Sequence, residues 1–181
     1  YDALPDSKHV LKKYGFAAVQ GKSYLFIDFE SMGVCTSIQE KIGKVTNSHE
    51  REVLQRTLAK QYVEAVKVLH DHSVYHLDIK PDNFLMSKEG VVVIADYGLS
   101  TTKINSVDGG TPQFMAPEAW GAGARADTCD RYSLGVTLHS IQSNALPFSF
   151  FTDAEKLQGK NLGEIAKKLT VTDPSKRPTL D

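Results

Sequence analysis

The stretch from Tyr75 to Leu85 constrains the fold more than any other, because it sets a carboxylate, an amine and an amide at short fixed spacings. In extended backbone, residues two positions apart point to the same side. Asp78 and Lys80 can therefore share one side of a loop, and Asn83 can close the arc. A chain with this stretch must present it as a loop that can bind a hydroxyl, a phosphate and a cation.

A second polar group follows a short apolar run. Residues 91–95 read Val-Val-Val-Ile-Ala and predict a strand that delivers Asp96 at its end. Gly98 lets the backbone turn sharply after Tyr97, so Asp96 would offer a second oxygen ligand near the loop. A His-x-Asp loop by itself is also typical of a surface turn that aspartate hydrogen bonds stabilise.

Further short motifs follow in a fixed order. They are Gly110-Thr111-Pro112, Ala116-Pro117-Glu118, Asp130, Asp173-Pro174 and Arg177-Pro178-Thr179. With His76-Leu77-Asp78 and Asp96-Tyr97-Gly98, the set resembles a eukaryotic-type protein kinase domain. The lysine two residues after the first aspartate and the segment 110–118 are more similar to Ser/Thr kinases than to tyrosine kinases. Two positions depart from the family pattern, because Leu77 replaces an arginine and Tyr97 replaces a phenylalanine.

The resemblance implies an α+β fold, a mainly helical kinase C-terminal lobe with a residual small-lobe β-hairpin. Residues 1–33 would be the end of the small lobe and the hinge, and residues 34–181 the large lobe, together one incomplete protein kinase domain. Apolar runs at 10–19 and 24–29, with Gly21 between them, predict the hairpin. The family's glycine-rich phosphate loop, strand lysine and helix glutamate have no counterpart in this sequence.

Apolar periodicity predicts the helices around the loop. A helix from Ser48 should bury one stripe of residues at three- and four-residue steps: Leu54, Leu58, Tyr62, Ala65 and Leu69. A second helix, opened by Asp130, is apolar on most faces and is expected in the centre of the core. The remaining expectations are a short helix and loop in 34–50, a small hairpin of 84–86 with 91–95, a loop at 144–151 and a last helix at 164–170.

The resemblance gives the polar residues roles in phosphoryl transfer. Asp78 would orient the substrate hydroxyl and accept its proton, and Lys80 would meet the charge that develops on the γ-phosphate. Thr111 would bridge these two side chains. Asn83 and Asp96 are hard oxygen ligands of the kind that Mg²⁺ prefers. ATP and Mg²⁺ are therefore the expected cofactors, and a protein serine or threonine is the expected acceptor.

The resemblance also implies an adenine pocket. Ile27 would guard its back, the backbone of Asp28 and Glu30 would bind adenine, and Leu85 would lie beneath the ring. An ordinary hairpin and loop is the alternative for residues 10–33. An apolar residue at position 85 is equally expected from core burial.

Other residues are expected to support the site. By resemblance, Glu118 and Arg177 would form a buried ion pair, and Asp130 would accept hydrogen bonds from N–H groups of the catalytic loop. The arginine that Leu77 replaces usually binds a phosphorylated residue of the activation segment, here residues 99–115, and leucine offers no donor. We therefore expect activity that does not depend on phosphorylation of that segment in the usual way.

Composition limits the partners of the chain. A formal net charge of -1 offers no basic field for nucleic acid, and no apolar run has the length of a membrane span. Cys35 and Cys129 lack metal-type spacing and suit a reducing compartment, so a cytoplasmic location is expected. The oligomeric state stays open. A truncated or pseudokinase-like interaction module without transfer activity is the alternative to an active kinase, since the lysine that grips nucleotide phosphates is missing.

Overall fold

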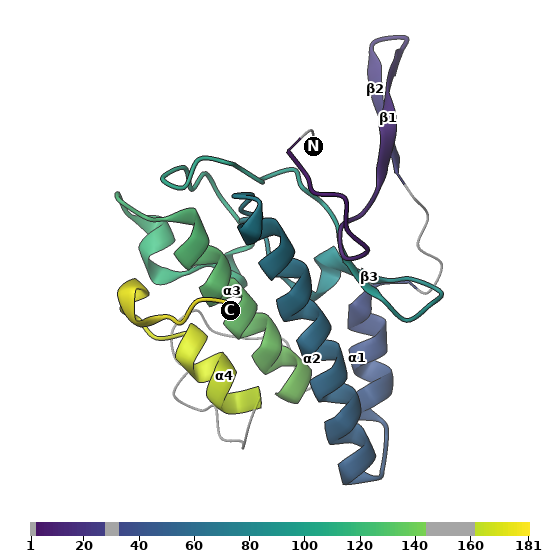
Figure 1. Cartoon of the computed structure of the whole chain (residues 1–181), viewed down its shortest axis with the longest axis vertical. Helices are drawn as coiled ribbons and strands as arrows, with labels where there is room; N and C mark the ends of the chain where they lie inside the picture. The colour runs from purple at the N-terminus through teal and green to yellow at the C-terminus, as the bar shows by residue number, and fades with distance from the viewer. Residues whose placement is uncertain (1–2, 28–32, 144–161) are drawn as a thin grey trace.

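The computed structural model describes residues 3–27, 33–143 and 162–181. Its helices and strands are β1 (Lys13–Val19), β2 (Lys22–Ile27), α1 (Cys35–Gly43), α2 (Ser48–Asp71), β3 (Phe84–Met86), β4 (Val92–Ile94), α3 (Ala126–Ser143) and α4 (Leu162–Leu169). β1 pairs with β2 and β3 pairs with β4, both antiparallel. Figure 1 shows the helices packed as one body, from which the β1–β2 hairpin projects. The prediction of a mainly helical α+β fold with a residual hairpin is confirmed.

The β1–β2 hairpin turns at Gln20 and Gly21, which have φ values of 50° and 75°. A two-residue turn of this hand matches the twist of the paired strands. The prediction that the first strand starts at residue 10 is wrong, because β1 begins at Lys13. Val10 instead forms a parallel bridge with Ile94, so the chain before β1 pairs with β4. The division of the chain at residue 33 stays a prediction.

Helix α2 begins at Ser48, as predicted. The residue before it, Asn47, caps the helix, because its side chain accepts hydrogen bonds from the backbone N–H groups of His49 and Glu50. Such a cap stabilises a helix by about 1 kcal/mol. The cap therefore fixes the point at which the chain enters the long helix.

The predicted stripe of α2 is buried except at one position. Leu54 is 37% exposed, so its assignment to the core is wrong. At that turn Gln55 takes the inward position, because its side-chain amide donates to the carbonyl oxygen of Ile141 in α3 at 2.9 Å. A buried hydrogen bond has replaced an apolar contact there.

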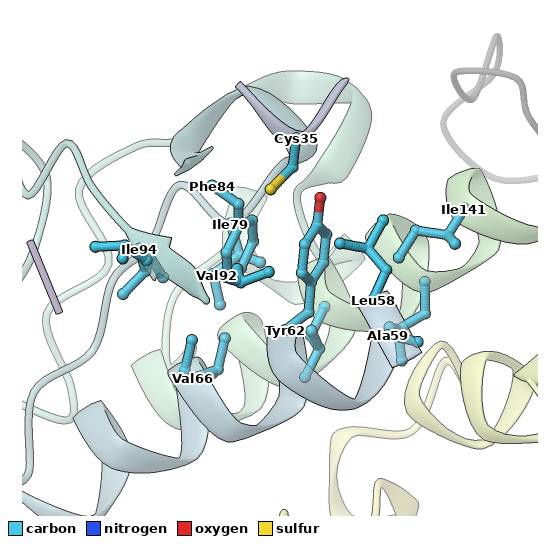
Figure 2. Close-up of a cluster of buried hydrophobic side chains, with 14 of the residues drawn as sticks. Cys35, Leu58, Ala59, Tyr62, Val66, Ile79, Phe84, Val92, Ile94 and Ile141 are labelled. Atoms are coloured by element: carbon cyan, nitrogen blue, oxygen red, sulfur yellow. The ribbon is translucent and has the colours of Figure 1, made fainter. Parts of the chain in front are cut away.

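The main core lies where α2 meets the β3–β4 sheet (Figure 2). Tyr62 stacks on Phe84, with ring centroids 4.0 Å apart and 8° between the ring planes. The residues labelled around this pair are Cys35, Leu58, Ala59, Val66, Ile79, Val92, Ile94 and Ile141. Burial of each large apolar side chain contributes about 1.5–3 kcal/mol. This cluster therefore fixes β3–β4, and the loops on either side of it, against α2.

Helix α3 is buried along most of its length, as expected for a central helix. It begins at Ala126, however, so the prediction that Asp130 opens it is wrong, and Asp130 lies in its second turn. Gly135 lets α4 approach closely. A Cβ atom at this position would lie 2.7 Å from Cγ2 of Thr170 and 2.8 Å from Cβ of Leu169.

The other predicted elements differ little from the structure. The short helix within 34–50 is α1, and β3 and β4 form the predicted small hairpin. The last helix begins at Leu162 rather than at residue 164. The loop predicted at 144–151 lies outside the described residues. Among the helices that the structure describes, none combines the length and the hydropathy of a membrane-spanning segment.

Candidate active site

The loop of residues 76–83 is anchored on Asp130 of α3. The Asp130 carboxylate is fully buried and accepts hydrogen bonds from the backbone N–H groups of His76 and Leu77, both at 2.7 Å. Leu77 has a φ of 64°, in the left-handed region. A buried carboxylate needs such donors, and they hold the loop in a backbone shape that residues rarely adopt unaided.

His70 also contacts Asp130, with Nε2 at 3.0 Å from Oδ2. This contact could not be predicted from the sequence, because it joins residues 60 positions apart and follows no periodic pattern. His70 lies in the last turn of α2, so this contact connects the end of α2 to the residue that anchors the loop.

His76 links the loop to the chain that leaves β4. Its Nε2 lies 2.8 Å from the carbonyl oxygen of Ala95, and its Nδ1 lies 3.3 Å from the backbone nitrogen of Asp78. A carbonyl oxygen can only accept and a backbone N–H can only donate, so Nε2 carries the proton and Nδ1 is the acceptor. His76 therefore ties the backbone of Asp78 to the residue just before Asp96.

The Asp78 carboxylate is surrounded by three side chains. Lys80 Nζ donates to its Oδ2 at 2.8 Å, and the Asn83 amide donates to the same oxygen at 2.9 Å. The Thr111 hydroxyl donates to Oδ1 at 2.6 Å, and the Thr111 backbone N–H donates to that oxygen at 2.9 Å. The structure therefore brings together four of the residues that the sequence singled out.

Thr111 lies between the acid and the amine. Its hydroxyl donates to Asp78 and accepts a hydrogen bond from Lys80 Nζ at 2.7 Å. Only 11% of the Asp78 side chain and 21% of the Lys80 side chain are exposed. Hydrogen bonds to charged groups are strong, and more so where little water reaches them, so the three side chains form one rigid unit.

The pKa of Asp78 reflects this environment. Burial acts to raise the pKa, but hydrogen bonds from Lys80, Thr111 and Asn83, together with the charge of Lys80, outweigh burial and hold the pKa below its ordinary value. Asp78 is therefore ionised at neutral pH. In that state it can accept a hydrogen bond from a hydroxyl group and then its proton.

Asn83 and Asp96 offer oxygen atoms to a cation. The Asn83 amide nitrogen donates to the backbone oxygen of Asp78 at 2.8 Å and to its carboxylate at 2.9 Å, so the amide oxygen is the atom left to act as a ligand. Asp96 is exposed and has a φ of 58°. The backbone oxygen of Asn83 accepts a hydrogen bond from the N–H of Ala95 at 2.9 Å, which holds the residue before Asp96 beside Asn83. Two hard oxygens fit Mg²⁺, which takes its remaining ligands from phosphate and water.

Tyr97 is buried and does more than fill the space of a phenylalanine. Its hydroxyl donates to the carbonyl oxygen of Ile94 at 2.7 Å, and its ring lies 5.4 Å from the ring of His76. The sequence predicted only the packing. The hydrogen bond could not be foreseen because its acceptor is a backbone atom. It ties the turn that follows Asp96 to the end of β4.

The segment 99–115 contacts the loop near both of its ends. Tyr75 and Thr101 exchange two backbone hydrogen bonds of 2.8 and 2.9 Å. Gly110 lies against Leu77, so that a Cβ atom at 110 would be 2.8 Å from the Leu77 carbonyl oxygen. Only glycine allows this close backbone approach, which delivers Thr111 to Asp78.

Leu77 is buried in a second apolar cluster. The cluster consists of Tyr75, Leu77, Ala116, Ala124, Ala126, Cys129 and Tyr132. Ile104 and Val107, both from the segment 99–115, pack against it. Apolar side chains therefore surround the position at which the family has an arginine.

Glu118 and Arg177 form the ion pair that the resemblance implied. Arg177 Nη2 lies 2.9 Å from Glu118 Oε2, and Nη1 contacts Oε1, so the pair is two-pronged. The Arg177 side chain is fully buried and also donates to the carbonyl oxygens of Thr128 and Val171. A buried guanidinium depends on such partners, so this pair fixes the chain that follows the segment 99–115.

The structure describes only part of the predicted adenine site. Asp28 and Glu30 lie outside the described residues, as does the side chain of Ile27. Leu85 is partly buried in β3, where it pairs with Val93 and is bridged to Val34. Its place beneath an adenine ring stays a prediction.

One family model and several known proteins are similar to this chain. The family model, described as "Protein kinase domain", matches residues 3–181. MAP kinase kinase skh1/pek1 of Schizosaccharomyces pombe is 32% identical over 148 residues, which cover 78% of this chain and 40% of that protein. CBL-interacting serine/threonine-protein kinase 20 of Arabidopsis thaliana is 31% identical over 173 residues, which cover 90% and 35%.

An Aurora kinase of Dictyostelium discoideum is 28% identical over 190 residues, which cover 95% of this chain and 48% of that protein. This chain therefore spans less than half the length of each of these three relatives.

Proposed function

We propose, since this chain belongs to the protein kinase domain family, that it carries the site at which a Ser/Thr protein kinase transfers the γ-phosphate of ATP to a protein hydroxyl. One observation carries the proposal. The ionised Asp78 carboxylate is held in one unit with Lys80 and Thr111, an acid and an amine bridged by a hydroxyl. Phosphoryl transfer asks mainly for such positioning of charged groups.

Asp78 and Lys80 have different parts in the reaction. Asp78 accepts a hydrogen bond from the substrate hydroxyl and takes its proton as the bond from oxygen to the γ-phosphorus forms. Lys80 meets the negative charge of the transferred group while the bond to the departing ADP breaks. Thr111 keeps the two side chains at a fixed separation.

Asn83 and Asp96 are the residues that would hold Mg²⁺. When bound, the ion neutralises phosphate charge and orients the ATP. Asp78 contributes here as well. Its backbone oxygen and its carboxylate accept hydrogen bonds from the Asn83 amide nitrogen, and these bonds set the direction of the amide oxygen. Ile27, Asp28, Glu30 and Leu85 complete the proposal as the adenine pocket, with residues 1–33 as the end of a small lobe.

Activity without phosphorylation of the segment 99–115 is part of the proposal. Leu77 offers no donor to a phosphate. Ile104 and Val107 pack against the cluster that contains it, and their burial stabilises the segment with no modification.

A cytoplasmic location is proposed from the two free cysteines, which are both buried.

A transfer assay with radiolabelled ATP tests the function on the full-length protein. We expect Asp78→Asn to lower the rate of transfer about 10²- to 10⁴-fold, because the general base is lost. Asp71→Asn is the matched control, since Asp71 is an exposed aspartate that pairs with Lys67 on the same helix, and its replacement should leave the rate unchanged. Equal rates for Asp78→Asn and the parent protein would refute the proposal.

A non-catalytic interaction module is the second candidate. The 181 residues contain no Gly-x-Gly-x-x-Gly loop. The two candidates differ in the same assay, since the module predicts no transfer by the parent protein and no effect of Asp78→Asn.

A further inference from the structure

His9 is a buried polar residue to which neither the sequence motifs nor the proposed mechanism assign a role. It lies in the chain before β1 and is 5% exposed. Its ring contacts two separate elements. Nδ1 lies 2.8 Å from the carbonyl oxygen of Val92 in β4, and Nε2 lies 3.5 Å from Oε2 of Glu64 in α2. A carbonyl oxygen only accepts, so Nδ1 carries the proton and donates to Val92.

The backbone of His9 and Leu11 also forms hydrogen bonds with β4. The N–H of Ile94 donates to the His9 carbonyl oxygen at 2.8 Å, and the N–H of Leu11 donates to the Ile94 carbonyl oxygen at 3.1 Å. Any residue at position 9 could make the backbone bond. Only a side chain with a donor at the place of Nδ1 could also hold Val92.

β4 leads directly to the predicted metal ligand. Ala95 follows β4, and its N–H and carbonyl groups are bonded to Asn83 and His76. Asp96 comes next, with its φ of 58°. The direction of its carboxylate therefore depends on where the end of β4 lies, and β4 is held on one edge by β3 and on the other by residues 9–11.

We propose that His9 is a positioning residue for Asp96: its Nδ1–H holds Val92, fixes β4, and so sets the carboxylate of Asp96 for Mg²⁺. The inference rests on the proposed function, in which Asp96 is a metal ligand. Residues that orient metal ligands directly change metal affinity about 10- to 100-fold when replaced. His9 acts through a strand, so its effect is smaller, about 3- to 10-fold.

The experiment uses variants that separate the two ring nitrogens. Asn can place its amide N–H near the position of Nδ1, whereas Leu keeps the bulk and has no donor. We expect His9→Leu to raise the Mg²⁺ concentration for half-maximal transfer about 3- to 10-fold at unchanged saturating rate, and His9→Asn to restore the parent value. Glu64→Gln, which alters the contact at Nε2 and the pair of Glu64 with the exposed Lys60 but keeps the bond at Nδ1, should match the parent protein.

Amide hydrogen exchange of residues 92–96 is the second readout, because it needs no metal. His9→Leu should speed exchange at Ile94 and Ala95, and His9→Asn should not. Equal Mg²⁺ dependence and equal exchange in His9→Leu and the parent protein would overturn the proposal, as would a defect in His9→Asn as large as that in His9→Leu. If His9→Leu does not fold, His9→Gln replaces it, since its longer side chain places the amide beyond Val92.

Asp96→Asn separates this inference from the function on which it rests. If this variant shows the Mg²⁺ dependence of the parent protein, the metal-binding role of Asp96 fails. The exchange measurement then still decides whether His9 fixes β4.

Discussion

Thr111 is the residue whose single hydroxyl contacts both charged groups of the candidate site. Thr111→Ala removes the hydroxyl bonds to Asp78 and Lys80 at 2.6 and 2.7 Å, whereas the direct contact of Asp78 with Lys80 and the bond from the backbone N–H of residue 111 to Asp78 remain. Hydrogen bonds to charged groups contribute about 1.5–3 kcal/mol. We therefore expect kcat for phosphate transfer to fall about 10- to 100-fold, with the thermal midpoint little changed.

Thr111→Ser is the matched control, because it keeps the hydroxyl and loses only the methyl group. It should retain most of the parent kcat. If serine lowers kcat as far as alanine does, the bridging hydroxyl is not what sets the geometry of Asp78 and Lys80.

Among the elements, the segment 99–115 is the one for which we propose that activity does not need phosphorylation. Besides the Thr111 hydroxyl, which contacts Asp78 and Lys80, backbone bonds and apolar packing around Leu77 hold it to the rest of the chain. The combined replacement by alanine of the four hydroxyl residues that precede Thr111 in this segment should therefore retain most of the transfer activity. The positions are Ser100, Thr101, Thr102 and Ser106. Activity that disappears in this variant and returns with acidic replacements would contradict the account.

Leu77→Arg tests the same element from the other side. The new guanidinium would replace an apolar side chain that is 6% exposed, in a cluster of apolar residues. Burial of an unpaired charge is costly, so this variant should unfold at a lower urea concentration than the parent protein. A stability equal to that of the parent protein would show that the cluster does not depend on leucine.

At the scale of the whole molecule, the pair of Glu118 and Arg177 joins residues 59 positions apart. Glu118→Ala leaves a buried guanidinium without its carboxylate, which should lower the free energy of unfolding by about 3–5 kcal/mol. Urea denaturation measures this. Lys176→Ala is the control, because Lys176 is 74% exposed and its pair with Asp173 is worth at most about 1 kcal/mol. Equal losses in the two variants would contradict the role of the buried pair.

The sequence predicted those parts of the molecule that repeat or lie close along the chain. Tyr62 and Leu69 follow the helical period, so the buried face of α2 could be predicted, and Asp78, Lys80 and Asn83 share one short loop. The pair of Glu118 and Arg177 came from the family resemblance alone. No local pattern connects residues so far apart.

The contacts that the sequence missed share a physical cause. Gln55, Tyr97 and His9 each donate to a backbone carbonyl oxygen, and a carbonyl has no residue identity that a pattern could match. This affects the predicted core of α2, because at the turn of Leu54 the buried position is occupied by Gln55. His70 and Asp130 are two side chains, but their contact spans 60 positions.

The central claim is that Asn83 and Asp96 bind one Mg²⁺ beside the unit of Asp78 and Lys80. A crystal structure of the full-length protein with Mg²⁺ and a non-hydrolysable ATP analogue tests it most directly. We expect a metal ion at about 2.0–2.1 Å from an oxygen of each ligand, with the terminal phosphate directed toward Lys80. A metal ion bound elsewhere, or an Asp96 carboxylate directed away from the nucleotide, would contradict it.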